Sequence, residues 1–235
     1  RVNSYEATQF RRWATEVLKQ YIVKGFVMDD ERLKGKDVFG ADYSDELLER
    51  IREIRTSERR YYQKITDIYA ECSSDYDPKS ETTRHFYKTV QNMMHFAVTH
   101  QTAAEIVHDR ADAEKPYMGL MTWKNAPDGR IVKSDVTVAK NYLSEQEVDE
   151  LNLLTTAFLD IAERRARRHV LTTMAEWKQV LEQYLKATDA DVLPDAGSGS
   201  HEEAESKAFG EYEKFRRIQD KTLLSDFDKF IERLK

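Results

Sequence analysis

The stretch DELLERIREIRTSERRYYQKITDIYAEC, residues 45–72, decides the fold, because its apolar side chains recur at the spacing of a helix. The pattern steps by three or four residues and is interrupted at Glu58. Its members are Leu47, Ile51, Ile54, Tyr61, Ile65, Ile68 and Cys72. A near-heptad row of this kind predicts one long helix that packs in an antiparallel pair or against a second protomer.

Helical periodicity continues on both sides of this stretch, and local start and stop signals divide it into segments. Ser or Thr followed three residues later by Glu forms a capping box, in which each side chain satisfies a backbone N–H of the other residue. These boxes are Thr102/Glu105, Ser144/Glu147, Thr173/Glu176 and Ser200/Glu203. The expected helices cover residues 5–24, 45–72, 81–100, 103–110, 135–143, 145–169, 174–186, 202–219 and 226–234. The prediction is an all-α bundle with long antiparallel helices.

One segment breaks the helical pattern, at residues 111–133, where two prolines and two glycines cluster. The sequence MGLMTW, a KNAPDG turn and RIVK allow either an irregular insert or a small β-hairpin. The helices beyond residue 198 follow a Gly/Ser linker, so residues 199–235 are read either as part of one domain over 1–235 or as an appendage to it.

Composition narrows the class of protein. The chain has 235 residues, a net charge of -6 and a single cysteine, so it contains no internal disulfide. No long apolar run and no signal peptide is visible, which predicts a cytoplasmic protein with no membrane partner. The start at Arg1, without Met, suggests a piece of a longer chain.

Polar side chains flank the insert and form the candidate site. Lys88, Asn92 and His95 share one face of the expected 81–100 helix. The candidate catalytic pocket comprises His95, Glu105, His108, Arg110 and Lys115, with Lys88, Asn92, Lys124 and Lys140 as binding residues. Such a pocket suits phosphate binding or acid–base chemistry. The alternative is a hydrogen-bonded network that ties the insert to the bundle.

Two further patterns bear on ligands. Arg164, Arg165, Arg167 and Arg168 suit phosphate contacts with nucleic acid, or equally the electrostatics of a helix C-terminus. EIVH at 105–108 is half of a di-iron motif, but no second half is present, so neither a metal nor a cofactor is expected.

Several segments together resemble the RhuM family of bacterial virulence-associated proteins: ATQFRRWATEVLKQYIVKGF, LLERIREIRTSERRYYQKITDIYA, TAAEIVHDRADAEKPYMGLMTWK, KSDVTVAKNYLS and SHEEAESKAFGEYEKFRRIQD. The resemblance implies a bacterial, DNA-linked protein whose upstream domain, similar to a winged helix-turn-helix, ends just before residue 1. It implies no reaction and no catalytic residues.

The leading functional hypothesis is therefore a non-enzymatic helical interaction and oligomerisation module, with homo-oligomer contacts made by the 45–72 helix. The other hypothesis is an enzyme that acts on a nucleotide, a nucleic acid or a phosphorylated small molecule through the pocket in the 85–124 region.

Overall fold

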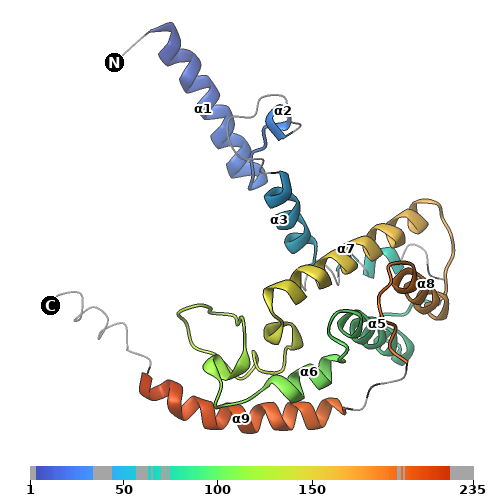
Figure 1. Ribbon diagram of the computed structural model, residues 1–235. Coiled ribbons are helices and arrows are strands. Elements are labelled where there is room, and N and C mark those ends of the chain that lie inside the picture. Colours follow the sequence, from blue (N-terminus) through green and yellow to red (C-terminus); the bar gives the residue numbers. More distant parts are fainter. Residues whose placement is uncertain are drawn as a thin grey trace. The chain divides into compact units, whose positions relative to one another are not determined.

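The computed structural model describes residues 4–33, 44–56, 63–64, 66–69, 73, 75–194, 197 and 199–222. Within these ranges every regular element is a helix and there is no β-strand, which confirms the all-α prediction (Figure 1). Internal contacts divide the chain into two compact units, residues 1–51 and 52–235, which are described separately.

The N-terminal unit contains helix α1, Tyr5–Lys24, and the short helix α2, Asp30–Leu33. The Ser4 side chain accepts a hydrogen bond from the backbone N–H of Ala7 at 3.1 Å and starts α1. Gly25, with φ 81°, stops it, since glycine enters the left-handed region without a Cβ clash. The predicted bounds of this helix are confirmed, yet none of its residues is buried.

The remaining helices, in chain order, are α3 (Ser44–Thr56), α5 (Glu81–Thr99), α6 (Ala103–Arg110), the 3-10 helices η1 (Pro116–Gly119) and η2 (Ala139–Tyr142), α7 (Glu145–Arg167), α8 (Met174–Ala187) and α9 (His201–Thr222). Helix α3 begins in the first unit and ends in the second. In three of the four predicted capping boxes, at the starts of α6, α7 and α8, both reciprocal hydrogen bonds between side chain and backbone are present. At the start of α9, the Ser200 side chain accepts from the backbone N–H of Glu203 at 3.0 Å.

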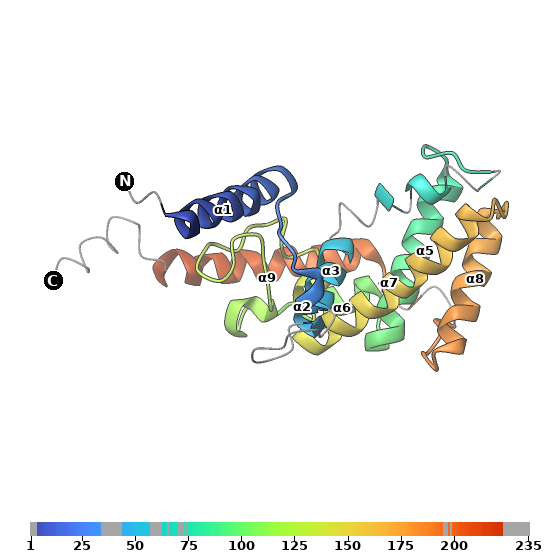
Figure 2. The ribbon, with the colours of Figure 1, turned by 90° about the horizontal axis from the view of Figure 1, so that it is seen from above.

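The core of the second unit forms where α5 packs against both α7 and α8, as Figure 2 shows. Aromatic rings fill the junction: Trp177 of α8 is fully buried and lies 5.2 Å from the Tyr69 ring and 6.4 Å from the Phe158 ring, centroid to centroid. Burial of such large apolar side chains, at about 25 cal/mol per Å² of apolar surface, holds the three helices together.

Helix α9 runs alongside α6 and also contacts η1 (Figures 1 and 2). Ala204 and Ala208 are both buried on the contact face, and these small side chains let the two helices approach closely. Polar groups of α9 also bind the insert: Glu211 accepts from the backbone N–H of Ala113 at 2.9 Å, and Gln219 exchanges two hydrogen bonds with the backbone of Ile131.

The insert at residues 111–133 is irregular, so the hairpin alternative is wrong. Its backbone N–H groups bond to side chains and to distant carbonyls instead of to a facing strand. The Asp135 carboxylate accepts from the backbone of Lys124 at 3.3 Å and of Val132 at 2.8 Å. The Trp123 indole N–H donates to the carbonyl of Gly129 at 2.8 Å, which closes the KNAPDG turn on itself.

The expected 135–143 helix is also corrected, because this segment consists of turns and the short η2. Val138 is extended, with φ -94° and ψ 106°, and interrupts the helical run. The carbonyl of Asn141 accepts from the backbone N–H groups of Met121 and Thr122, so the segment is bonded to the insert rather than to its own next turn.

Two further predictions extend beyond the described part of the chain. Of the expected 45–72 helix, residues 44–56, 63–64 and 66–69 are helical, while residues 57–62, 65 and 70–72 lie outside the described residues. The expected 226–234 helix also lies outside them. Among the helices described, none is both long and apolar enough to cross a membrane.

Candidate functional site

A cavity with a volume of about 1060 Å³ lies in the second unit. Its wall is built from α5, α6, η2, α7, the last residue of α3 and the segment that leads into α9. The polar side chains that carry the following argument are Thr56, Lys88, Asn92, His95, Lys140 and Asn152. A cavity of this size accommodates a small organic molecule.

His95 is the most unusual group in this wall. It sits on α5 with only 4% of its surface exposed, and within the described residues its Nδ1 atom has no hydrogen-bond partner. Burial, together with the smaller effects of the positive charges of Lys140 and Arg110, lowers the pKa of His95 to about 4. The imidazole is therefore neutral at physiological pH.

Lys140, Asn152 and Thr56 form a chain of hydrogen bonds across the cavity wall. The Asn152 side-chain oxygen accepts from the Thr56 hydroxyl at 2.7 Å and from the Lys140 ammonium at 3.3 Å. On α5, the Asn92 side-chain oxygen accepts from the backbone N–H of Ala103 at 3.3 Å. Both amides therefore use their oxygen for the protein, which fixes the orientation of their NH₂ groups.

Four of the predicted residues are thus brought to one cavity: Lys88, Asn92, His95 and Lys140. Sequence reasoning missed Asn152 and Thr56, although one signal was available. Asn152 lies between Leu151 and Leu154 on the inner face of α7 and is 4% exposed. A buried amide at a position expected to be apolar indicates a specific polar partner.

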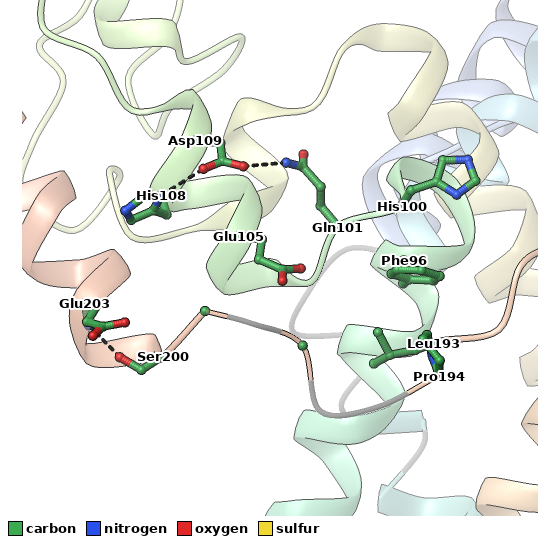
Figure 3. Close-up of a pocket in the computed structure, with 12 residues that line it drawn as sticks. Phe96, His100, Gln101, Glu105, His108, Asp109, Leu193, Pro194, Ser200 and Glu203 are labelled. Carbon is green, nitrogen blue, oxygen red and sulfur yellow. Dashed lines mark hydrogen bonds and ion pairs between the residues drawn. The ribbon is translucent and has the colours of Figure 1, made fainter.

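Glu105 and His108 line a second, smaller pocket of about 660 Å³, shown in Figure 3. His108 Nδ1 is 2.8 Å from the Asp109 carboxylate, and the other oxygen of that carboxylate accepts from the Gln101 amide at 2.8 Å. The Glu105 carboxylate accepts from the backbone N–H and hydroxyl of Thr102 as part of its capping box. The Asp109 and Glu105 carboxylates therefore bind groups of their own segment and stabilise the local fold.

Arg110 and Lys115 line neither of these two cavities. The Arg110 guanidinium makes a bidentate ion pair with Glu147, with both N–O distances 2.7 Å, and also donates to the carbonyl of Tyr142 at 3.0 Å. The ion pair lowers the pKa of Glu147 and raises that of Arg110. Lys115 and Lys124 are exposed on the insert. The structure therefore distributes the predicted catalytic set over separate places.

The basic cluster at the end of α7 is divided in a similar way. Arg165 donates to the Thr172 hydroxyl at 3.1 Å, and its guanidinium carbon lies 5.6 Å from the centroid of the Trp177 ring. Arg167 pairs with Glu163 at 2.8 Å. Arg164 and Arg168 are exposed. Arg165 thus has a packing role, while Arg164 and Arg168 present their charge to solvent.

The N-terminal unit carries a surface of a different character. On α1, Phe10, Trp13, Val17 and Tyr21 recur at spacings of three and four, so they share one face. The Phe10 and Trp13 side chains are 64% and 63% exposed, and their rings touch each other at a centroid distance of 5.8 Å. A broad apolar face is thus left open on this helix.

Comparison with known proteins gives one match. The model of the family described as "Virulence protein RhuM family" matches residues 1–223, nearly the whole chain. Neither the curated proteins nor the solved structures contain a match. Among the described residues, no three His, Cys, Asp or Glu side chains form a group that could hold a metal ion.

Proposed function

The chain belongs to the virulence protein RhuM family, and we propose that it is a helical interaction and oligomerisation module that associates through its N-terminal unit. The observation that carries this proposal is that α1, a helix of 20 residues with an apolar face, has no buried residue. In proteins, most of the stability of a helix comes from the packing of its apolar face against another element.

The exposed apolar surface is concentrated in this part of the chain. Among the described residues, most of the large exposed hydrophobic side chains belong to the first unit, including Ile22, Phe26 and Val27 around the end of α1. Scattered apolar side chains are normal on protein surfaces, whereas a continuous patch marks an interaction site.

Helix α3 supports the same interpretation. Leu48, Ile51 and Ile54 recur every third residue, and each is at least 40% exposed. Ile51 and Ile54 belong to the near-heptad row that predicts a protomer contact in the 45–72 segment. In the described part of that row, Ile68 is buried in the core of the second unit, so the contact is proposed for the α3 part alone.

The occupant that we propose for the α1 face is a second copy of the same helix in antiparallel orientation. Glu6 lies in the first turn of α1 and Lys24 in its last turn. Antiparallel pairing brings Glu6 of one copy near Lys24 of the other, and it also sets the two helix dipoles in opposite directions. In the same arrangement, Arg12 of one copy lies near Glu16 of the other, close to the middle of the helix.

Multi-angle light scattering of the 235-residue chain over a range of concentrations tests this proposal. Val17 lies on the apolar face and Val23 lies on another side of the same helix, 75% exposed. Val17→Glu places a charge in the contact and is expected to produce monomers, because a buried unpaired charge is strongly unfavourable. Val23→Glu makes the same chemical change outside the contact and is expected to leave the oligomer intact.

A chain that is monomeric at all concentrations refutes self-association. A monomer in which the α1 face resists chemical labelling would show that the chain covers this face itself. In a longer chain of the kind that the family resemblance implies, the module would bring DNA-binding domains together. A weakening of specific DNA binding by Val17→Glu in the full-length protein would support that link.

A further inference from the structure

We propose that the large cavity of the second unit is a binding site for a small phosphate monoester, held between the α5 wall and the wall made by η2 and α7. This proposal is independent of self-association, because it rests on residues of the second unit alone. It concerns binding and assigns no reaction.

The first argument is the chemistry of the polar groups in the wall. Because Asn92 and Asn152 use their oxygens within the protein, their NH₂ groups are left to present donors. The ammonium groups of Lys88 and Lys140 are donors only. These four side chains present donors, and an anionic oxygen group is the ligand chemistry that meets them best.

The second argument is His95. A side chain that is 4% exposed and has no hydrogen-bond partner for Nδ1 in the described part of the chain leaves a buried polar atom unsatisfied. Such atoms are rare in native proteins, and a functional role or a bound ion is among the recognised explanations for them. The ring that carries this atom lines the cavity.

The electrostatic environment agrees with an anion at the His95 end of the cavity. Lys140 and Arg110 both act on the His95 ring with positive charge. Helix α6 also begins at this wall, at Ala103, and helix N-termini carry a partial positive charge.

The acids of the wall lie on α9. Glu202 is exposed, and Glu205 is 3.4 Å from the His201 ring. The anionic group is therefore placed away from α9, between His95 and Lys140. A phosphate monoester fits better than a carboxylate, because its three terminal oxygens can accept from donors on facing walls whereas a planar carboxylate offers two. The cavity volume of about 1060 Å³ leaves room for the organic part of the ester.

Calorimetric titration of the whole chain with inorganic phosphate, ribose 5-phosphate and adenosine 5′-monophosphate tests the proposal, with acetate as the carboxylate comparison. We expect at least one monoester to bind with a dissociation constant below about 1 mM. Lys140→Met removes a charged donor, and we expect it to weaken this binding by about tenfold or more. Lys124→Met makes the same change on an exposed side chain of the insert that does not line the cavity, and binding should be unchanged.

A measurement on the unmodified protein keeps the test valid if Lys140→Met fails to fold. The ring nitrogens of His95 should shift in ¹H–¹⁵N spectra on addition of the bound monoester, while those of the exposed His85 should not. The proposal is overturned if none of the phosphate probes binds, if acetate binds as well as they do, or if binding persists unchanged in Lys140→Met without a shift at His95.

Discussion

Replacement of His95 by Gln should remove a specific part of the acid sensitivity of this protein. Below about pH 6.5 the ring takes up a proton in the unfolded chain, whereas in the folded chain it does so only near its lowered pKa of about 4. Protonation therefore favours the unfolded state as the pH falls between these values. The free energy of unfolding that His95 contributes is present above about pH 6.5 and is lost progressively down to about pH 4.

The magnitude follows from the two pKa values. A lowering from 6.5 to about 4, at about 1.4 kcal/mol per pH unit, corresponds to about 3 kcal/mol over the full range. Between about pH 7 and about pH 4.5, most of it, about 2 kcal/mol, should be lost. His95→Gln carries no titrating ring, so its unfolding free energy should fall by about 2 kcal/mol less than that of the wild type over this interval.

Urea unfolding followed by tryptophan fluorescence, at several pH values and in phosphate-free buffer, measures both proteins. The carboxylates of the chain are common to both proteins, so their contribution cancels in the difference. His85→Gln, at an exposed position of the same helix, is the matched control and should follow the wild type. Parallel pH profiles for the wild type and His95→Gln would refute the account of a buried, neutral imidazole.

Two further substitutions test roles assigned to charged residues. Glu147→Gln keeps the shape of the side chain but breaks the ion pair with Arg110, and it should lower the unfolding free energy by about 1–2 kcal/mol at neutral pH. The pKa of Glu147 is lowered in the folded state, so this difference between the two proteins should vanish once the pH falls below the range in which Glu147 titrates. Arg165→Ala removes the contact with the Trp177 ring and should cost about 1–2 kcal/mol, whereas Arg168→Ala should change stability by less than about 0.5 kcal/mol, both measured by the same urea titration.

The parts of the fold that the sequence predicts well are those specified by neighbouring residues. Ser4 and Gly25 mark the ends of α1 because the cap and the stop involve only adjacent turns of the chain. The capping boxes at Thr102 and Ser144 are local in the same way. Segments whose backbone bonds to distant partners are not predicted. The 135–143 segment has helical spacing, but the Asn141 carbonyl bonds to the backbone of the insert, and this tertiary pairing competes with the local preference.

The candidate site could be predicted only in part, for the same reason. The spacing of Lys88, Asn92 and His95 places them correctly on one face of α5, because helical geometry is local. The opposite wall comes from residues more than forty positions away in the sequence, such as Lys140 and Asn152. No periodicity within one helix reveals which of two facing helices will cover a histidine, so the burial of His95 follows only from the packed structure.

Arg110 shows how a residue can serve a site without entering it. Its partner Glu147 also caps α7, so the bidentate pair joins the end of α6 to the start of α7, two helices that both contribute to the cavity wall. The guanidinium is saturated by Glu147 and by the carbonyl of Tyr142, yet its charge still acts on the His95 ring. Loss of Glu147 would therefore loosen the wall and change the potential inside it together. Glu147→Gln leaves the Arg110 charge uncompensated, so if the cavity binds the anion and its wall stays intact, the affinity for phosphate should rise. A loss of stability with unchanged affinity would separate the structural role of the ion pair from the proposed site.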